Sequence, residues 1–389
     1  MNAPILEPAA LETLLDLLAI EGLSGQETQI SREITRFCRS AGVSKKDIGL
    51  DGAEKRIGRG FEIGNLLVRL PGTRRGPRRL FMTHMDTVPL CRGARPVRKG
   101  DLIVPAGPTA LGGDNRTGCA CLITMIETIL REKLDHPPLT ILFTVGEEIG
   151  LLGSRHLRKK DLRGIQMGFN VDGGTPSRFV VGAIGSTDWR IEVEGIAAHA
   201  GAQPERGVSA AIITAKALEK IHRDGWFGKI EKGRNRGTAN VGRIEGGQAT
   251  NEVTPRMTIE GESRSHQPAF RKRIVAAYEK AFARAARAVR NVDGISGTSR
   301  LEIVDSFEAF RISARSDAGR HAARAARAVG LDPEFQVCNG GLDATPLNEK
   351  GIPTVTFGAG QNQPHSLDEH VNIPDYFDSC RLAVALATL

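Results

Sequence analysis

Three short apolar runs in this sequence each end abruptly in histidine or carboxylate side chains. They are residues 80–83 before His84, residues 140–145 before Glu147 and Glu148, and residues 166–171 before Asp172. Runs of β-branched and aromatic residues of this length predict buried strands. Helical patterns lie between them, so the sequence predicts an α/β sheet. Such sheets place their sites at the carboxyl ends of the strands, where these polar side chains would meet.

Further polar side chains fall on bends or at strand ends. Asp114 lies on a glycine-rich bend before a helical pattern, and His365 follows an apolar run at residues 353–358. His84 and Asp86 are two residues apart, so in extended backbone they point to the same side. Nitrogen and carboxylate donors without thiolate suit zinc, cobalt or manganese. Two histidines and three carboxylates exceed the needs of one tetrahedral zinc and fit two metals that share a bridging carboxylate.

The N-terminal stretch predicts two helices within residues 7–40. Ser24 and Glu27 have the spacing of a capping box, which would open the second helix.

The pattern changes in the middle of the chain. The 389 residues exceed what one compact core usually holds. Residues 184–306 predict strand, helix, two strands, helix and strand, with alternating polarity typical of a half-exposed sheet. We therefore expect an inserted α+β domain, with residues 1–183 and 307–389 forming the catalytic domain.

The amino-acid composition limits which binding partners and which cellular compartment can be expected. The net charge is +8, but the arginines alternate with alanines at residues 282–290 and only 5% of residues are aromatic, which argues against nucleic-acid binding. No apolar run approaches the ~18 residues that a membrane span needs. Residues 1–4 begin no secretory signal, and the six cysteines are scattered without C-x-x-C pairs. We expect a cytoplasmic protein with reduced thiols and no membrane partner.

Several motifs occur in a fixed order along the chain. They are His84-Met85-Asp86, Gly112-Gly113-Asp114-Asn115, Glu147-Glu148, Asp172-Gly173-Gly174 and Pro364-His365-Ser366, with Ala197-Ala198-His199-Ala200-Gly201, Asn251 before Thr254-Pro255, and Glu262-Ser263-Arg264 in the insert. Together they resemble the co-catalytic zinc exopeptidases, a family that includes peptidase T, carboxypeptidase G and the acetylornithine and succinyl-diaminopimelate deacylases. The stretches at 172–174 and 341–344 resemble the peptidase T-like branch most closely. The resemblance implies a mixed, largely parallel sheet with helices on both faces, and an inserted lid domain.

The same resemblance implies a role for each matching residue. Asp114 would bridge two divalent ions, with zinc as first choice and cobalt or manganese as alternatives, and would precede a cis peptide. The other ligands would be His84 and Asp172 at one metal, and Glu148 and His365 at the other. Asp86 would accept the second N–H of His84 and fix its tautomer. Glu147 would act as general base and then as general acid.

The insert would complete the site. The resemblance implies that His199 reaches the scissile carbonyl oxygen of a substrate in a neighbouring subunit, and hence a homodimer formed through the lid. Asn251 and Arg264 would bind the substrate's carboxylate, for which the bidentate fork of arginine is suited.

These residues predict a di-metal hydrolase that cleaves an amide bond of short peptides, most closely an aminopeptidase of the tripeptidase type. An N-acyl amino acid amidohydrolase on the same scaffold is the alternative, because the chemistry is identical and only the group beside the scissile carbonyl differs. A non-catalytic binding protein is a third interpretation. Its signature would be a lost ligand or a lost Glu147, and the sequence has neither loss.

Overall fold

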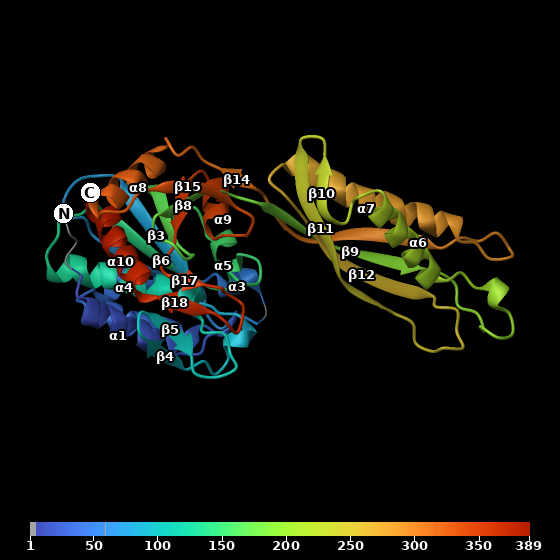
Figure 1. The fold of residues 1–389 in the computed structure, drawn as a ribbon, viewed down its shortest axis with the longest axis horizontal. Helices are drawn as coiled ribbons and strands as arrows, with labels where there is room; N and C mark the ends of the chain where they lie inside the picture. Colours follow the sequence, from blue (N-terminus) through green and yellow to red (C-terminus); the bar gives the residue numbers. More distant parts are fainter. Residues whose placement is uncertain (1–4, 59) are drawn as a thin grey trace. The chain divides into compact units, whose positions relative to one another are not determined.

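The computed structural model describes residues 5–58 and 60–389. Residues 1–4, on which the expectation about a secretory signal rests, lie outside this part. The chain divides into two compact units, the first comprising residues up to Gly182 and from Arg311, and the second Ala183–Phe310 (Figure 1). The predicted insert of residues 184–306 falls within the second unit. None of the helices in the described part is long and apolar enough to cross a membrane.

The first unit is built on a nine-stranded sheet in the order β1-β2-β6-β3-β7-β16-β8-β14, with β15 paired to β8. The four central strands, which run parallel to one another, are β6 (Leu139–Thr144), β3 (Arg78–His84), β7 (Ile165–Val171) and β16 (Thr354–Phe357). The outer strands are β1 (Ile48–Leu50), β2 (Leu66–Leu70), β8 (Arg178–Ala183), β14 (Phe310–Arg311) and β15 (Glu334–Cys338). The predicted α/β class with a mixed, largely parallel sheet is therefore confirmed.

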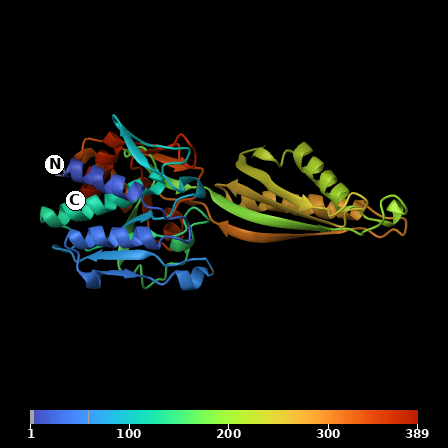
Figure 2. The same cartoon turned by 90° about the horizontal axis from the view of Figure 1, so that it is seen from below.

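Helices cover both faces of this sheet because its central strands are apolar on both sides. In β3, Phe81 packs into the larger core, whereas Leu80 and Met82 pack into a smaller core on the other side. The larger core includes residues of α1 (Glu7–Leu18), α2 (Thr28–Ser40), α4 (Gly113–Arg131), α8 (Asp317–Ala328) and α10 (Ile373–Thr388). The remaining helices of the unit are α3 (Glu54–Ile57), α5 (Leu152–Arg155) and α9 (Ala344–Glu349). Figure 2 shows α1 and α4 side by side.

A smaller antiparallel sheet joins the C-terminal part of the chain to the segment before α4. Its strands, in spatial order, are β17 (Gln361–Asn362), β18 (His370–Asn372), β5 (Leu102–Pro105) and β4 (Pro96–Lys99). Val371 of β18 pairs with Ile103 of β5. This pairing fixes the position of the loop between β17 and β18.

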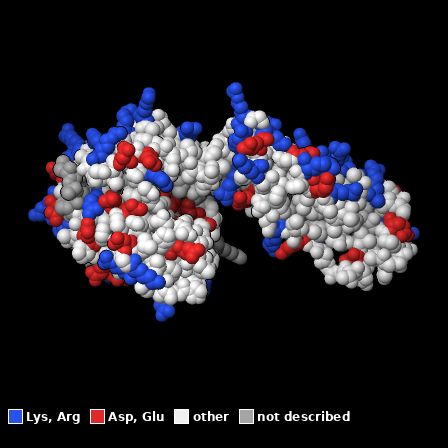
Figure 3. All heavy atoms as spheres, in the orientation of Figure 1, with Lys and Arg blue, Asp and Glu red and all other residues white. Residues whose placement is uncertain are grey.

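The second unit is a five-stranded antiparallel sheet with two helices. Along the chain its elements are β9 (Gly185–Glu194), α6 (Ala210–Arg223), β10 (Gly228–Lys232), β11 (Asn235–Gly246), β12 (Arg256–Ser265), α7 (Pro268–Ala288) and β13 (Thr298–Phe307). Trp189, Ile191 and Val193 are buried in the core with both helices, while the residues between them are more exposed. On the face drawn in Figure 3, basic and acidic side chains are interspersed over this unit. The sheet has one strand more than expected, β10, whose only fully buried side chain is Ile230.

Candidate metal centre

The polar side chains singled out in the first unit lie at the ends of the central strands or on the bends beside them. His84 is the last residue of β3, Glu147 follows β6, and Asp172 follows β7. Asp114 lies in the first turn of α4, and His365 lies in the loop between β17 and β18. Because parallel strands present their carboxyl ends at one edge of the sheet, the topology gathers these residues.

Asp114 stands between the two histidines. Its Oδ1 atom lies 3.0 Å from Nε2 of His84, and its Oδ2 atom lies 3.5 Å from Nε2 of His365. His365 Nε2 also lies 2.9 Å from Oε2 of Glu148. One carboxylate oxygen toward each histidine is the arrangement that a carboxylate needs if it is to bridge two cations. The peptide between Asp114 and Asn115 is cis, as the resemblance implies.

Asp172 is held beside this group by a separate contact. Its Oδ1 atom accepts a hydrogen bond of 3.1 Å from Nε2 of Gln361, whose Oε1 atom accepts one of 2.8 Å from the Thr117 hydroxyl. Burial and the charge of Asp114 raise the pKa of Asp172 to about 8. The Asp172 carboxylate therefore lies in the electrostatic field of the other carboxylates.

Asp86 organises both the His84 ring and the turn after β6. Its two carboxylate oxygens accept the backbone N–H groups of Glu147 (3.0 Å) and Glu148 (3.2 Å), and one also accepts the Ser24 hydroxyl at 2.6 Å. His84 Nδ1 lies 3.0 Å from the backbone oxygen of Asp86 and 3.4 Å from its Oδ1 atom. These contacts leave Nε2 of His84 facing Asp114.

Glu147 differs from its neighbour Glu148. Among the described residues, none forms a hydrogen bond with the Glu147 carboxylate, whereas Glu148 contacts His365. Burial raises the pKa of Glu147 well above its ordinary value, and the charges of Asp172 and Asp343 add to the effect. A half-buried carboxylate without a fixed partner is free to exchange a proton with a bound substrate or water.

The donor set fits divalent cations. His84, Asp114 and Glu148 offer ligand atoms that all lie within 4.8 Å of one another. Burial raises the pKa of Glu148, and contacts with Asp114 and Glu148 raise the pKa of His365 to about 10. Carboxylates gathered in this way repel one another unless cations offset their charge. Imidazole and carboxylate without thiolate suit zinc, cobalt or manganese.

The predicted capping box of Ser24 and Glu27 is wrong. Ser24 donates to Asp86, and Oε1 of Glu27 accepts the backbone N–H groups of Gly25 and Gly146, each at 3.0 Å. The helix begins at Thr28 without a side-chain cap. Tertiary partners outcompete the local ones, so both residues support the candidate metal centre and the turn that carries Glu147.

Asp343 is a third residue whose part in the site the sequence did not reveal. Its buried carboxylate accepts hydrogen bonds from the hydroxyls of Thr144 and of Ser154, the latter at 2.5 Å. Thr144 precedes the turn of Glu147 and Ser154 follows it, so Asp343 ties the two ends of this turn together. The only sequence signal was the resemblance of residues 341–344 to the peptidase T-like branch.

The three remaining candidates lie in the second unit. His199 is exposed, and its Nδ1 atom accepts the backbone N–H groups of Gly201 and Ala202, each at 3.1 Å. In the neutral ring the proton therefore resides on Nε2, which makes that atom a donor. The N–H of Ala200 donates to the backbone oxygen of Asn251 at 2.8 Å, so the segments of His199 and Asn251 are adjacent.

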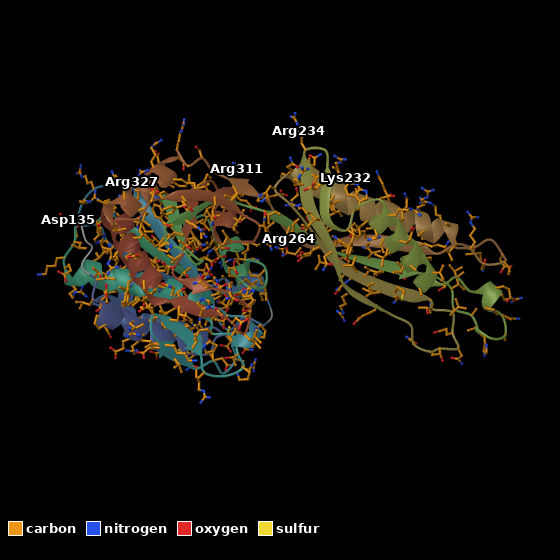
Figure 4. The ribbon with its side chains drawn as sticks, viewed as in Figure 1. Asp135, Lys232, Arg234, Arg264, Arg311 and Arg327 are labelled. Carbon is orange, nitrogen blue, oxygen red and sulfur yellow. The ribbon has the colours of Figure 1, made fainter. Side chains whose placement is uncertain are left out.

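Arg264, labelled in Figure 4, lies near the end of β12. Its guanidinium forms a two-pronged ion pair with Glu262, with distances of 3.1 Å from Nε and 2.8 Å from Nη2. A substrate carboxylate at Arg264 would therefore have to share the guanidinium with Glu262 or displace it.

Comparisons with known proteins find similar chains along nearly the whole length of this one. The model of peptidase family M20/M25/M40 matches residues 80–388. The uncharacterized protein YqjE of Bacillus subtilis is 31% identical, with 98% of each chain covered. The crystal structure of a Staphylococcus aureus tripeptidase is similar to this chain, with a TM-score of 0.88 and 27% sequence identity. The crystal structure of the aminopeptidase PepT of Bacillus cereus is also similar, with a TM-score of 0.84 and 29% sequence identity. Each covers 99% of this chain and 98% of its own.

Proposed function

The chain belongs to peptidase family M20/M25/M40, and we propose that it is a two-metal aminopeptidase of the tripeptidase type. The observation that carries the proposal is the position of Asp114 between His84 and His365, beside a Glu147 carboxylate that has no fixed partner. The likeness to a tripeptidase and to the aminopeptidase PepT over nearly the whole chain supports the choice of substrate.

The proposed ligands are Asp114 between the metals, His84 and Asp172 at one ion, and Glu148 and His365 at the other. Two divalent cations held there would polarise the scissile carbonyl and lower the pKa of an attacking water toward neutrality. Zinc is our first choice. Gln361 orients Asp172 through a hydrogen bond. Asp86 holds the His84 ring at the angle at which this ring contacts Asp114.

Glu147 is the proposed proton carrier. Its carboxylate would take a proton from the attacking water and return one to the leaving amine. The hydrogen bonds from the backbone of Glu147 and Glu148 to Asp86 hold the turn in place, so the Glu147 side chain keeps its position through both transfers. Within the second unit, Asn251 and Arg264 are the proposed contacts for the substrate's carboxylate.

His199→Ala tests the proposed part of the second unit. The Nε2–H group of His199 would donate to the scissile carbonyl oxygen of a substrate in the partner of a homodimer, so its loss should lower kcat by roughly 10²–10³-fold. The measurement is steady-state kinetics with metal content determined in parallel, and metal content should not change. A kcat equal to that of the unmodified protein would remove His199 from the mechanism.

The substrate class is tested with a matched pair of peptides. Free trialanine should be cleaved from its N-terminus, and N-acetyl-trialanine should be at least about tenfold poorer in kcat/KM. The physical reason is that a site built for an ammonium group leaves its acceptors unpaired when that group is acylated. Amine release from both peptides is followed with metal-loaded protein.

N-acetyl and N-succinyl amino acids serve as the comparison in the same assay. Faster turnover of these compounds than of trialanine would replace the aminopeptidase with an N-acyl amino acid amidohydrolase. The two-metal hydrolase would stand in either case, because the chemistry at the scissile bond is the same.

A further inference from the structure

Glu369 is a buried carboxylate that the proposed mechanism does not use. It is 1% exposed and lies in the loop between β17 and β18, four residues beyond His365. Its Oε2 atom accepts the backbone N–H groups of Leu111 (2.7 Å) and Gly112 (2.8 Å). Its Oε1 atom accepts the backbone N–H of Asp114 at 2.9 Å. One side chain thus pairs three main-chain donors of the bend that carries Asp114.

The bend is shaped to admit this carboxylate. Gly112 has φ of +79°, which favours glycine. A Cβ atom on Gly113 would lie 3.3 Å from Oε1 of Glu369 and 2.9 Å from Cγ2 of Val371. The two glycines therefore permit both the turn and the close approach of the segment that carries Glu369.

The segment itself is anchored on both sides of Glu369. Val371 belongs to β18, which pairs with β5, and Gln361 belongs to β17 and binds both Asp172 and Thr117. His365, between these anchors, contacts Asp114 and Glu148. The position of Glu369 relative to the bend is therefore fixed by the sheet rather than by the loop alone.

We propose that Glu369 is a positioning residue, which holds the bend of residues 111–114 so that Asp114 turns one carboxylate oxygen to each metal position. This inference rests on the proposed two-metal function. Without Glu369, three buried N–H groups would lose their acceptor, and the bend would rearrange to find others. Asp114 would then lose the backbone orientation on which both of its oxygen contacts depend.

Glu369→Gln is the sharpest test. The glutamine amide has a single acceptor oxygen. That oxygen can accept either the N–H groups of Leu111 and Gly112 or the N–H group of Asp114, and the NH₂ group must then face the N–H donors that the oxygen does not serve. We expect metal affinity to fall by about 10–100-fold, the usual effect of losing a residue that orients a ligand. Affinity is measured by competition with a chromophoric chelator, for both ions. Because Asp114 faces both histidines, the affinity for each of the two ions should fall. Excess metal should restore much of kcat.

Asp368→Asn is the matched control. Asp368 is the exposed neighbour in the same loop, so this variant removes the same charge without touching the bend, and metal affinity should not change. Glu369→Asp is the second variant for the case that glutamine prevents folding. It keeps the charge but is one methylene too short to reach all three donors, so it should also bind metal more weakly.

The outcomes separate the inference from the function on which it rests. Unchanged metal affinity in a folded Glu369→Gln or Glu369→Asp variant overturns the positioning role and leaves the two-metal function intact. If the thermal unfolding midpoint of the metal-free protein falls while metal affinity is unaltered, Glu369 contributes to stability alone, and the positioning role is again overturned. An unmodified protein that binds no divalent ion overturns the function, and the inference with it.

Discussion

Removal of metal by a chelator is expected to abolish peptide hydrolysis, and added divalent cation is expected to restore it. The half-buried carboxylates of Asp114, Glu148 and Asp172 repel one another, and the charge of Asp114 helps to raise the pKa values of the other two. Cations relieve this repulsion while they activate the substrate and water, so the loss of activity should be complete. Elemental analysis of the purified protein should find about two divalent ions per chain.

Thermal unfolding with and without chelator is the control for this experiment. An ion that binds only the folded state stabilises it, so the unfolding midpoint should rise with metal concentration while the metal-free protein remains folded. Hydrolysis that survives chelation, in a protein that elemental analysis finds free of metal, would contradict the assignment of the whole centre.

Glu147→Gln should reduce kcat by roughly 10²–10⁴-fold, the range for losing a positioned general base. Glutamine keeps the size of the side chain but does not accept a proton from water or return one to the amine. The backbone N–H of residue 147 still donates to Asp86, so the turn is preserved. Metal content and KM should therefore stay close to those of the unmodified protein.

Glu148→Gln is the matched control, because it makes the same chemical change at the adjacent residue. Glu148 contacts His365 and is a proposed ligand, so this variant should lose metal affinity, in contrast to Glu147→Gln. If the two variants exchange their behaviour, the assignments of base and ligand must be reversed. If Glu147→Gln retains full kcat, another group carries the proton.

The central strands of the sheet could be predicted because burial on both faces leaves an unbroken apolar run. Strands β6 and β7 have such apolar runs. Strand β6 leads into Glu147 and Glu148, and strand β7 leads into Asp172. Strand β10 could not be found in this way, because it lies at the edge of its sheet and Ile230 is its only fully buried side chain. The formation of an edge strand depends on hydrogen bonds to its neighbouring strand more than on the strand's own pattern of apolar residues.

The proposed ligands, and Asp86 beside His84, were recognisable from the order of their motifs, whereas the other residues that support them were not. Glu27 and Glu369 accept main-chain N–H groups from segments distant in sequence, and any residue type can supply such a donor. Ser24 had a local partner at the right spacing, which made the capping box the natural interpretation. Only the three-dimensional structure shows which of the competing partners each side chain takes.

The order in which the site's parts occur along the chain also bears on how the enzyme is made. His84, Asp114, Glu148 and Asp172 leave the ribosome before the entire second unit, whereas His365 and Glu369 follow it. A growing chain therefore carries His84 and three mutually repelling acids before His365 and Glu369, which complete the proposed centre, have been made. Under the proposed assignment, the complete set of ligands exists only after translation has passed residue 365, so we expect a chain to bind both metal ions only once its second unit has been made.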